Sequence, residues 1–98
     1  MRENQYQSKL IRKIKAIFPD AMVLKNDSGY LQGVPDLLIL NDEKWAALEC
    51  KRSKSAKHRP NQGYYVDKMN GMSYASFVYP ENEQEVLSEL QRALDPSR

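Results

Sequence analysis

The spacing of apolar residues along the chain predicts three helices. An amphipathic helix, in which lysine and arginine separate the apolar positions, is expected to end before Pro19. A second helix is expected from Pro60, which suits a first helical turn, to about Asn70, with Gly71 ending it. The last is expected over residues 81–94, where acidic residues in the first turn favour the positive end of the helix dipole. The apolar positions of the first and last helices are Tyr6, Leu10, Ile14, Ile17 and Phe18, and Val86, Leu87, Leu90 and Leu94.

Four shorter apolar runs between these helices predict strands. They cover residues 21–25, 34–40, 45–51 and 74–79. The second run is nearly continuous, which is typical of a strand buried on both faces. Its proline must lie at the start or at an unpaired position, because it has no N–H to donate. The compact turn 41–44 predicts that the second and third strands form a hairpin.

The order of these elements predicts an α/β fold. Helices and strands follow one another as α-β-β-β-α-β-α, which indicates a mixed sheet covered by helices. Residues 26–33 are rich in asparagine, aspartate, serine and glycine, and are expected to form a loop. A chain of 98 residues, of which 41% are hydrophobic and 29% charged, suits one globular domain over residues 1–98.

Charge is distributed unevenly along the chain, although the net charge is only +2. Residues 51–59 contain basic side chains and no acid, whereas residues 81–95 are acidic. A basic surface suits a polyanion such as DNA, but an uneven solvated surface explains the same pattern equally well. The candidate nucleic-acid contacts are Lys51, Arg52, Lys54, Lys57 and Arg59.

The sequence carries no sign of a membrane segment or of an oxidising compartment. No stretch approaches the roughly 20 apolar residues that cross a bilayer. Residues 1–5 lack the apolar run of a secretory signal. The single cysteine, Cys50, excludes an internal disulfide and a multi-cysteine zinc site. We therefore expect a cytoplasmic protein without membrane contact.

Polar residues stand inside or beside the most apolar strands. Asp36 precedes four aliphatic residues, and Glu49 and Lys51 end the third predicted strand. Alternate side chains of a strand share a face, so Glu49 and Lys51 should project together, about 7 Å apart. Cys50 should point to the opposite face, where a thiol suits a core. Because burying an unpaired charge is costly, these groups need partners or a bound ion.

A hairpin would bring Asp36 and Glu49 together, because the start of its first strand lies beside the end of its second. Two carboxylates at one point repel each other unless a cation neutralises them. Oxygen ligands of this kind suit Mg²⁺ or Mn²⁺. Lys51 beside them could position a water or stabilise charge on a phosphate. Salt bridges from the two acids to Lys51 or Arg52 are the simpler alternative.

These residues resemble the signature of a nuclease superfamily. Pro35-Asp36, followed thirteen residues later by Glu49-Cys50-Lys51, is similar to the PD-(D/E)XK motif. The wider context resembles the VRR-NUC branch, from about Glu3 to Tyr79. That context comprises Asn26-Asp27-Ser28-Gly29, Gly33-Val34-Pro35-Asp36-Leu37-Leu38, Glu49-Cys50-Lys51-Arg52, Pro60-Asn61-Gln62 and Gly71.

The resemblance implies a restriction-endonuclease-like core and a role for each matching residue. Asp36 and Glu49 would bind the metal, with the Cys50 carbonyl as a further ligand, and Lys51 would be the catalytic lysine. Gln62 would orient the substrate or the lysine, although taken alone it is a plain helix-surface residue. Glu3 matches an acid that many relatives carry on the first helix; its alternatives are Gln7, one turn later, and a solvated acid without a role.

The resemblance also implies a substrate and an assembly. Standalone relatives of this size include phage-type enzymes that act as dimers on branched DNA. We therefore expect a structure-selective DNA endonuclease, such as a Holliday-junction resolvase, acting as a homodimer in a bacterial or phage-infected cell. The alternatives are a nucleic-acid-binding module without the chemistry, and a subunit of a larger restriction or repair enzyme.

Overall fold

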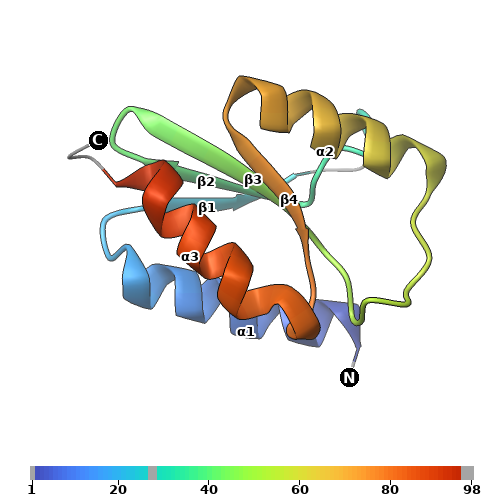
Figure 1. Cartoon of the computed structure of the whole chain (residues 1–98), viewed down its shortest axis with the longest axis horizontal. Coiled ribbons are helices and arrows are strands. Elements are labelled where there is room, and N and C mark those ends of the chain that lie inside the picture. Colours follow the sequence, from blue (N-terminus) through green and yellow to red (C-terminus); the bar gives the residue numbers. More distant parts are fainter. Residues whose placement is uncertain (1, 27–28, 96–98) are drawn as a thin grey trace.

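The computed structural model describes residues 2–26 and 29–95, and it confirms the α/β class and the predicted element order (Figure 1). Asp27 and Ser28, which belong to the predicted loop 26–33, lie outside the described residues. Within the described part of the chain, no helix has the length and apolar character needed to span a bilayer. The elements are α1 (Glu3–Ile17), β1 (Met22–Lys25), β2 (Leu37–Asn41), β3 (Lys44–Cys50), α2 (Pro60–Met72), β4 (Tyr74–Val78), the 3₁₀ helix η1 (Pro80–Asn82) and α3 (Glu83–Leu94).

The sheet is mixed, with its four strands in the order β1-β2-β3-β4. The first three strands are antiparallel, and β4 runs parallel to β3. The predicted hairpin is present, and its turn is formed by Asp42 and Glu43, because Asn41 pairs with Lys44. Asp42 has a φ of 56°, the left-handed conformation that aspartate tolerates better than most residues. Helix α2 makes the crossover that a parallel pair of strands requires.

One face of the sheet carries the main core. Helices α1 and α3 lie side by side under this face, whereas α2 lies on the other (Figure 1). The apolar stripe of each of these helices points into the core, as the spacing predicts. Their fully buried residues are Leu10 and Ile14 of α1, and Val86, Leu90 and Leu94 of α3. The strands contribute Leu37, Ile39, Ala46, Leu48, Cys50 and Val78.

The face under α2 carries a smaller cluster. Its buried members are Ala47, Val66 and Ala75, whose side chains are short. Larger, partly buried side chains such as Trp45, Met69 and Phe77 pack around them. This second layer adds little core, and it packs the middle of α2 against β3 and β4.

Three predicted boundaries were wrong, each for a local reason. Strand β2 begins at Leu37 and not at Val34, consistent with a proline that cannot donate to the ladder. Alternate residues of β2 are only half-buried, so the strand is not buried on both faces. Gly71 does not end α2, which continues to Met72, and Gly71 does not adopt a positive φ. The last helix begins with η1 at Pro80 before α3.

Candidate metal centre

The end of the β2–β3 hairpin joins Asp36 to Glu49. The register pairs Leu37 with Leu48, so the two acids occupy the next position of the ladder. The backbone N–H of Asp36 donates to Glu49 Oε1 at 3.2 Å, and the N–H of Cys50 donates to Asp36 Oδ1 at 3.1 Å. Each side chain is therefore held by the backbone of the opposite strand. The predicted convergence of the two acids is confirmed.

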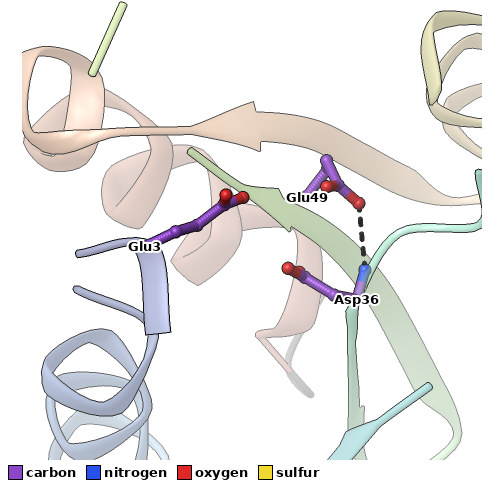
Figure 2. A group of neighbouring side chains, drawn as sticks. All are labelled: Glu3, Asp36 and Glu49. Carbon is purple, nitrogen blue, oxygen red and sulfur yellow. Dashed lines mark hydrogen bonds between the residues drawn. The ribbon is translucent and has the colours of Figure 1, made fainter. Parts of the chain in front are cut away.

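Glu3 completes a cluster of three carboxylates. It is the first residue of α1, and its side chain extends toward the gap between Asp36 and Glu49 (Figure 2). One oxygen from each of the three acids lies within 4.8 Å of the others. Three segments distant in sequence thus place oxygen ligands around one point. Glu3 is the α1 residue in this carboxylate cluster. The side chain of Gln7, the other candidate on α1, also acts on Asp36, where it opposes the rise in pKa that burial causes. Which of the two completes the site stays a prediction.

Burial and mutual repulsion raise the pKa values of two acids in the cluster. Burial, followed by the charges of Asp36 and Glu3, raises the pKa of Glu49 to about 8, although Lys51 acts against the shift. Burial also raises the pKa of Asp36, despite the hydrogen bond that it accepts from the Cys50 backbone. Both carboxylates are therefore costly to ionise together. A divalent cation between the carboxylates would remove that cost, so this set of oxygen donors fits a metal site.

Lys51 is buried with a polar partner beside the cluster. Its side chain is 6% exposed, and its Nζ donates to Gln62 Oε1 at 2.7 Å. Glu49 Oε2 lies 3.9 Å from the same nitrogen and accepts a hydrogen bond from Gln62 Nε2 at 2.9 Å. Gln62 thus bridges the lysine and the carboxylate. The structure places Gln62 at the site and not on the helix surface.

Cys50 lies between the two polar residues in sequence but on the other face in space. Its side chain is fully buried in the main core. Burial and the nearby charges of Asp36 and Glu49 raise the pKa of its thiol, so the neutral form is favoured. The alternation predicted for residues 49–51 is confirmed. The role expected for the Cys50 carbonyl as a metal ligand stays a prediction.

A cavity of about 450 Å³ opens beside the cluster. Glu3 belongs both to the carboxylate cluster and to the wall of this cavity, which connects the two features. Basic side chains form much of the remaining wall. The lining residues are Glu3, Lys51, Lys57, His58, Arg59 and Gln62.

The five predicted nucleic-acid contacts are not equivalent. Lys57 and Arg59 line this cavity, and so does the buried Lys51. Arg52 is exposed and is not among the lining residues. The backbone N–H of Lys54 donates to the Glu81 carboxylate at 3.3 Å, so the start of the acidic segment packs against the basic one.

His58 is not among the predicted site residues, and it is an exposed loop residue that lines the cavity. Its ring stacks on Phe77 with the centroids 4.1 Å apart and the planes 12° from parallel. Phe77 is the β4 partner of Glu49 in the sheet register. The stack places the histidine at the cavity wall, although no local signal in residues 51–59 indicates it.

Comparison with known proteins adds no identification. The chain matches no family model, no curated protein and no solved structure. Membership of the VRR-NUC family therefore stays a prediction. The chemistry of the site must be inferred from its own residues.

Proposed function

We propose that this protein is a nuclease that hydrolyses phosphodiester bonds of DNA and depends on Mg²⁺ or Mn²⁺. One observation carries the proposal: three carboxylates from separate segments lie within 4.8 Å of one another, beside a buried lysine. Carboxylates alone are common on surfaces, and a lysine alone is usually solvated. Their combination at the wall of a basic cavity suits a reaction at a phosphate.

The three carboxylates are the groups that would hold the cation. A bound Mg²⁺ or Mn²⁺ would supply Lewis-acid polarisation of the phosphate and would lower the pKa of a water. Asp36 and Glu49 are fixed by backbone N–H groups of the opposite strand, so their positions are set before a ligand arrives. Glu3 stands at the start of α1 and is exposed, and it can adjust to the ion.

Lys51 would act on the phosphate itself. An ammonium group has three N–H donors, and Gln62 accepts one of them at 2.7 Å. A further donor could reach a phosphoryl oxygen in the adjoining cavity and stabilise the negative charge that grows there as water attacks phosphorus. Low exposure strengthens that interaction, because little water screens it.

The finer features of the substrate rest on the sequence resemblance. Branched DNA, such as a four-way junction, is the proposed substrate, and a homodimer is the proposed assembly because paired cuts require two sites. The proposed setting is the cytoplasm of a bacterial or phage-infected cell.

A binding module without catalysis is the alternative function. It predicts salt-dependent DNA binding and no cleavage in any divalent metal. The buried lysine between Glu49 and Gln62 favours catalysis, since a purely structural role would be met at lower cost by an apolar side chain.

The test compares three single variants on a panel of DNA structures. Asp36→Asn and Lys51→Met should each lower cleavage at least about a hundredfold in Mg²⁺ or Mn²⁺ while the protein stays folded. Asp67→Asn is the matched control, because Asp67 is an exposed acid of α2 outside the site. The substrates are single-stranded, duplex, flap and four-way-junction DNA, with chelator as the blank. Undiminished cleavage by folded Asp36→Asn would contradict the proposal. So would a wild-type protein that cleaves none of the substrates in either metal.

A further inference from the structure

The loop that leads into Asp36 forms a second cavity, outside the carboxylate cluster. This cavity measures about 310 Å³ and is lined by Asn26, Tyr30, Leu31 and Val34. We propose that it binds an unpaired nucleobase of the strand that is cleaved, with Tyr30 as the stacking surface. The inference rests on the proposed nuclease function for its substrate, but its residues and its test are separate.

Both ends of this loop are fixed. At its base, the N–H of Asn26 donates to the Asp36 carbonyl at 2.9 Å, and the Asn26 side-chain amide donates to the Pro35 carbonyl at 2.6 Å. Farther along, Gly33 lies against α2 so closely that a Cβ there would stand 2.4 Å from the Asn61 Cβ. These contacts tie Asn26 to the backbone of Pro35 and Asp36, and Gly33 to α2, on either side of Tyr30 and Leu31.

Tyr30 is unusually exposed for an aromatic residue. It is 92% exposed, the highest value among the exposed large hydrophobic residues of the described chain, and the adjacent Leu31 is 42% exposed. These exposed side chains do not gain the favourable free energy of burying apolar surface. Binding a flat apolar ligand would bury that surface and supply this free energy. Stacking on a nucleobase is one such contact, and it contributes substantially to binding of single strands.

The charge around the loop indicates that the flat ligand belongs to a polyanion. Arg59 lines the cavity beside Glu3, and it also lines a cleft of about 230 Å³ with Gln32 and Gly33. Arg59 thus connects the cavity beside the carboxylate cluster with a cleft whose residue Gln32 is next in sequence to Leu31 of the proposed base site. A nucleic acid strand fits this arrangement, with a phosphate at the guanidinium and the neighbouring base at the tyrosine ring.

The base must be unpaired because the Tyr30 ring can stack only on a base whose face is exposed. In a continuous duplex both faces of each base are covered by neighbours, whereas single strands and branch points expose them. The apolar wall formed by Leu31 and Val34 suits the ring, and no base-specific donor pattern is required. The site should therefore prefer exposed bases without reading their sequence.

The test measures binding separately from cleavage. Fluorescence anisotropy in chelator follows a labelled single-stranded oligodeoxynucleotide, the same strand with abasic positions, and the corresponding blunt duplex. Tyr30→Ala should weaken binding of the intact single strand about tenfold. It should change binding of the abasic strand and the duplex less than twofold. Tyr30→Phe should restore binding, since it retains the ring. Tyr64→Ala, at a tyrosine of α2 that is 60% exposed, is the matched control and should behave as wild type.

The outcomes separate this inference from the proposed function. If Tyr30→Ala binds the intact strand as wild type does, or loses equal affinity for the abasic strand, the base site is refuted even where the wild type cleaves DNA. If the wild type cleaves nothing in any metal but shows the Tyr30-dependent preference for intact bases, the base site stands and the nuclease proposal fails.

Discussion

The side-chain oxygen of Gln62 accepts a hydrogen bond from the Lys51 ammonium at 2.7 Å, and both side chains are buried. The same oxygen accepts the backbone N–H of Arg59 at 3.0 Å, while the amide nitrogen donates to Glu49. One amide thus ties the start of α2 to the end of β3. Because it contacts the side chains of both Lys51 and Glu49, Gln62 is a positioning residue of the proposed site.

Replacing Gln62 should affect stability and cleavage together. Gln62→Ala leaves the buried Lys51 ammonium without its acceptor, and we expect the free energy of unfolding to fall by about 1–3 kcal/mol. Cleavage should fall as well, since the lysine loses its fixed position. Urea unfolding and the cleavage assay measure the two effects. Gln84→Ala, at an exposed glutamine of α3, is the matched control. Unchanged stability and cleavage in Gln62→Ala would contradict the positioning role.

The sequence predicts the elements well because their patterns are local. The spacing of Tyr6, Leu10 and Ile14 needs only the helical period, and all three are buried. The predicted start of the strand at Val34 was wrong, because the pattern of apolar residues does not say which residues form hydrogen bonds with a neighbouring strand. Gly71 was misread for a related reason, since a glycine ends a helix only where the chain adopts positive φ there.

The site was predictable as far as the hairpin determines it. Alternation and register bring Asp36, Glu49 and Lys51 together with no further information. The contribution of Glu3 depends on how α1 packs under the sheet, and that packing is set by long-range contacts. The stack of His58 on Phe77 and the loop that holds Tyr30 depend on tertiary contacts in the same way. These features have no local pattern that could reveal them.

The basic wall of the cavity should contribute to DNA binding through phosphate contacts. Lys57→Ala and Arg59→Ala should each weaken binding to DNA of any sequence. Each should also reduce the slope of log Kd against log salt concentration by about one. Anisotropy titrations over a salt series in chelator measure this slope. Arg92→Ala removes an exposed arginine of α3 that does not line the cavity, and should leave the slope unchanged. Equal slopes in all three variants would show that the cavity wall does not touch phosphates.

The stability of the metal-free protein should fall as pH rises. The pKa of Glu49 is raised from 4.5 to about 8 in the folded chain, so the folded state binds this proton more tightly than the unfolded state does. The stabilisation is complete below about pH 4.5 and is lost as pH rises through about 8. Urea unfolding in chelator from pH 5 to 8.5 measures the slope.

Mg²⁺ or Mn²⁺ should reverse this pH dependence, because the cation binds the ionised carboxylates. The stabilisation by added metal should therefore increase from pH 5 to 8. Glu49→Gln is the control: it carries no titrating proton, so its unfolding should show a flatter pH profile and little stabilisation by metal. A wild-type profile that is flat in chelator, or that metal leaves unchanged, would argue against a cation between these carboxylates.

The contact between Gly33 and Asn61 should tolerate no side chain. Gly33 has a φ of 92°, and an added Cβ would stand 2.4 Å from the Asn61 Cβ and 2.9 Å from its backbone carbon. Gly33→Ala must therefore move either the loop that holds Tyr30 or the start of α2, and we expect a loss of at least about 1 kcal/mol in stability. Gly63→Ala is the matched control, because nothing lies within 4 Å of its added Cβ, and a helical alanine should stabilise by up to about 1 kcal/mol. Urea unfolding compares the two, and opposite signs are expected. If both substitutions stabilised the chain, the loop that carries Tyr30 would not be held against α2 at Gly33.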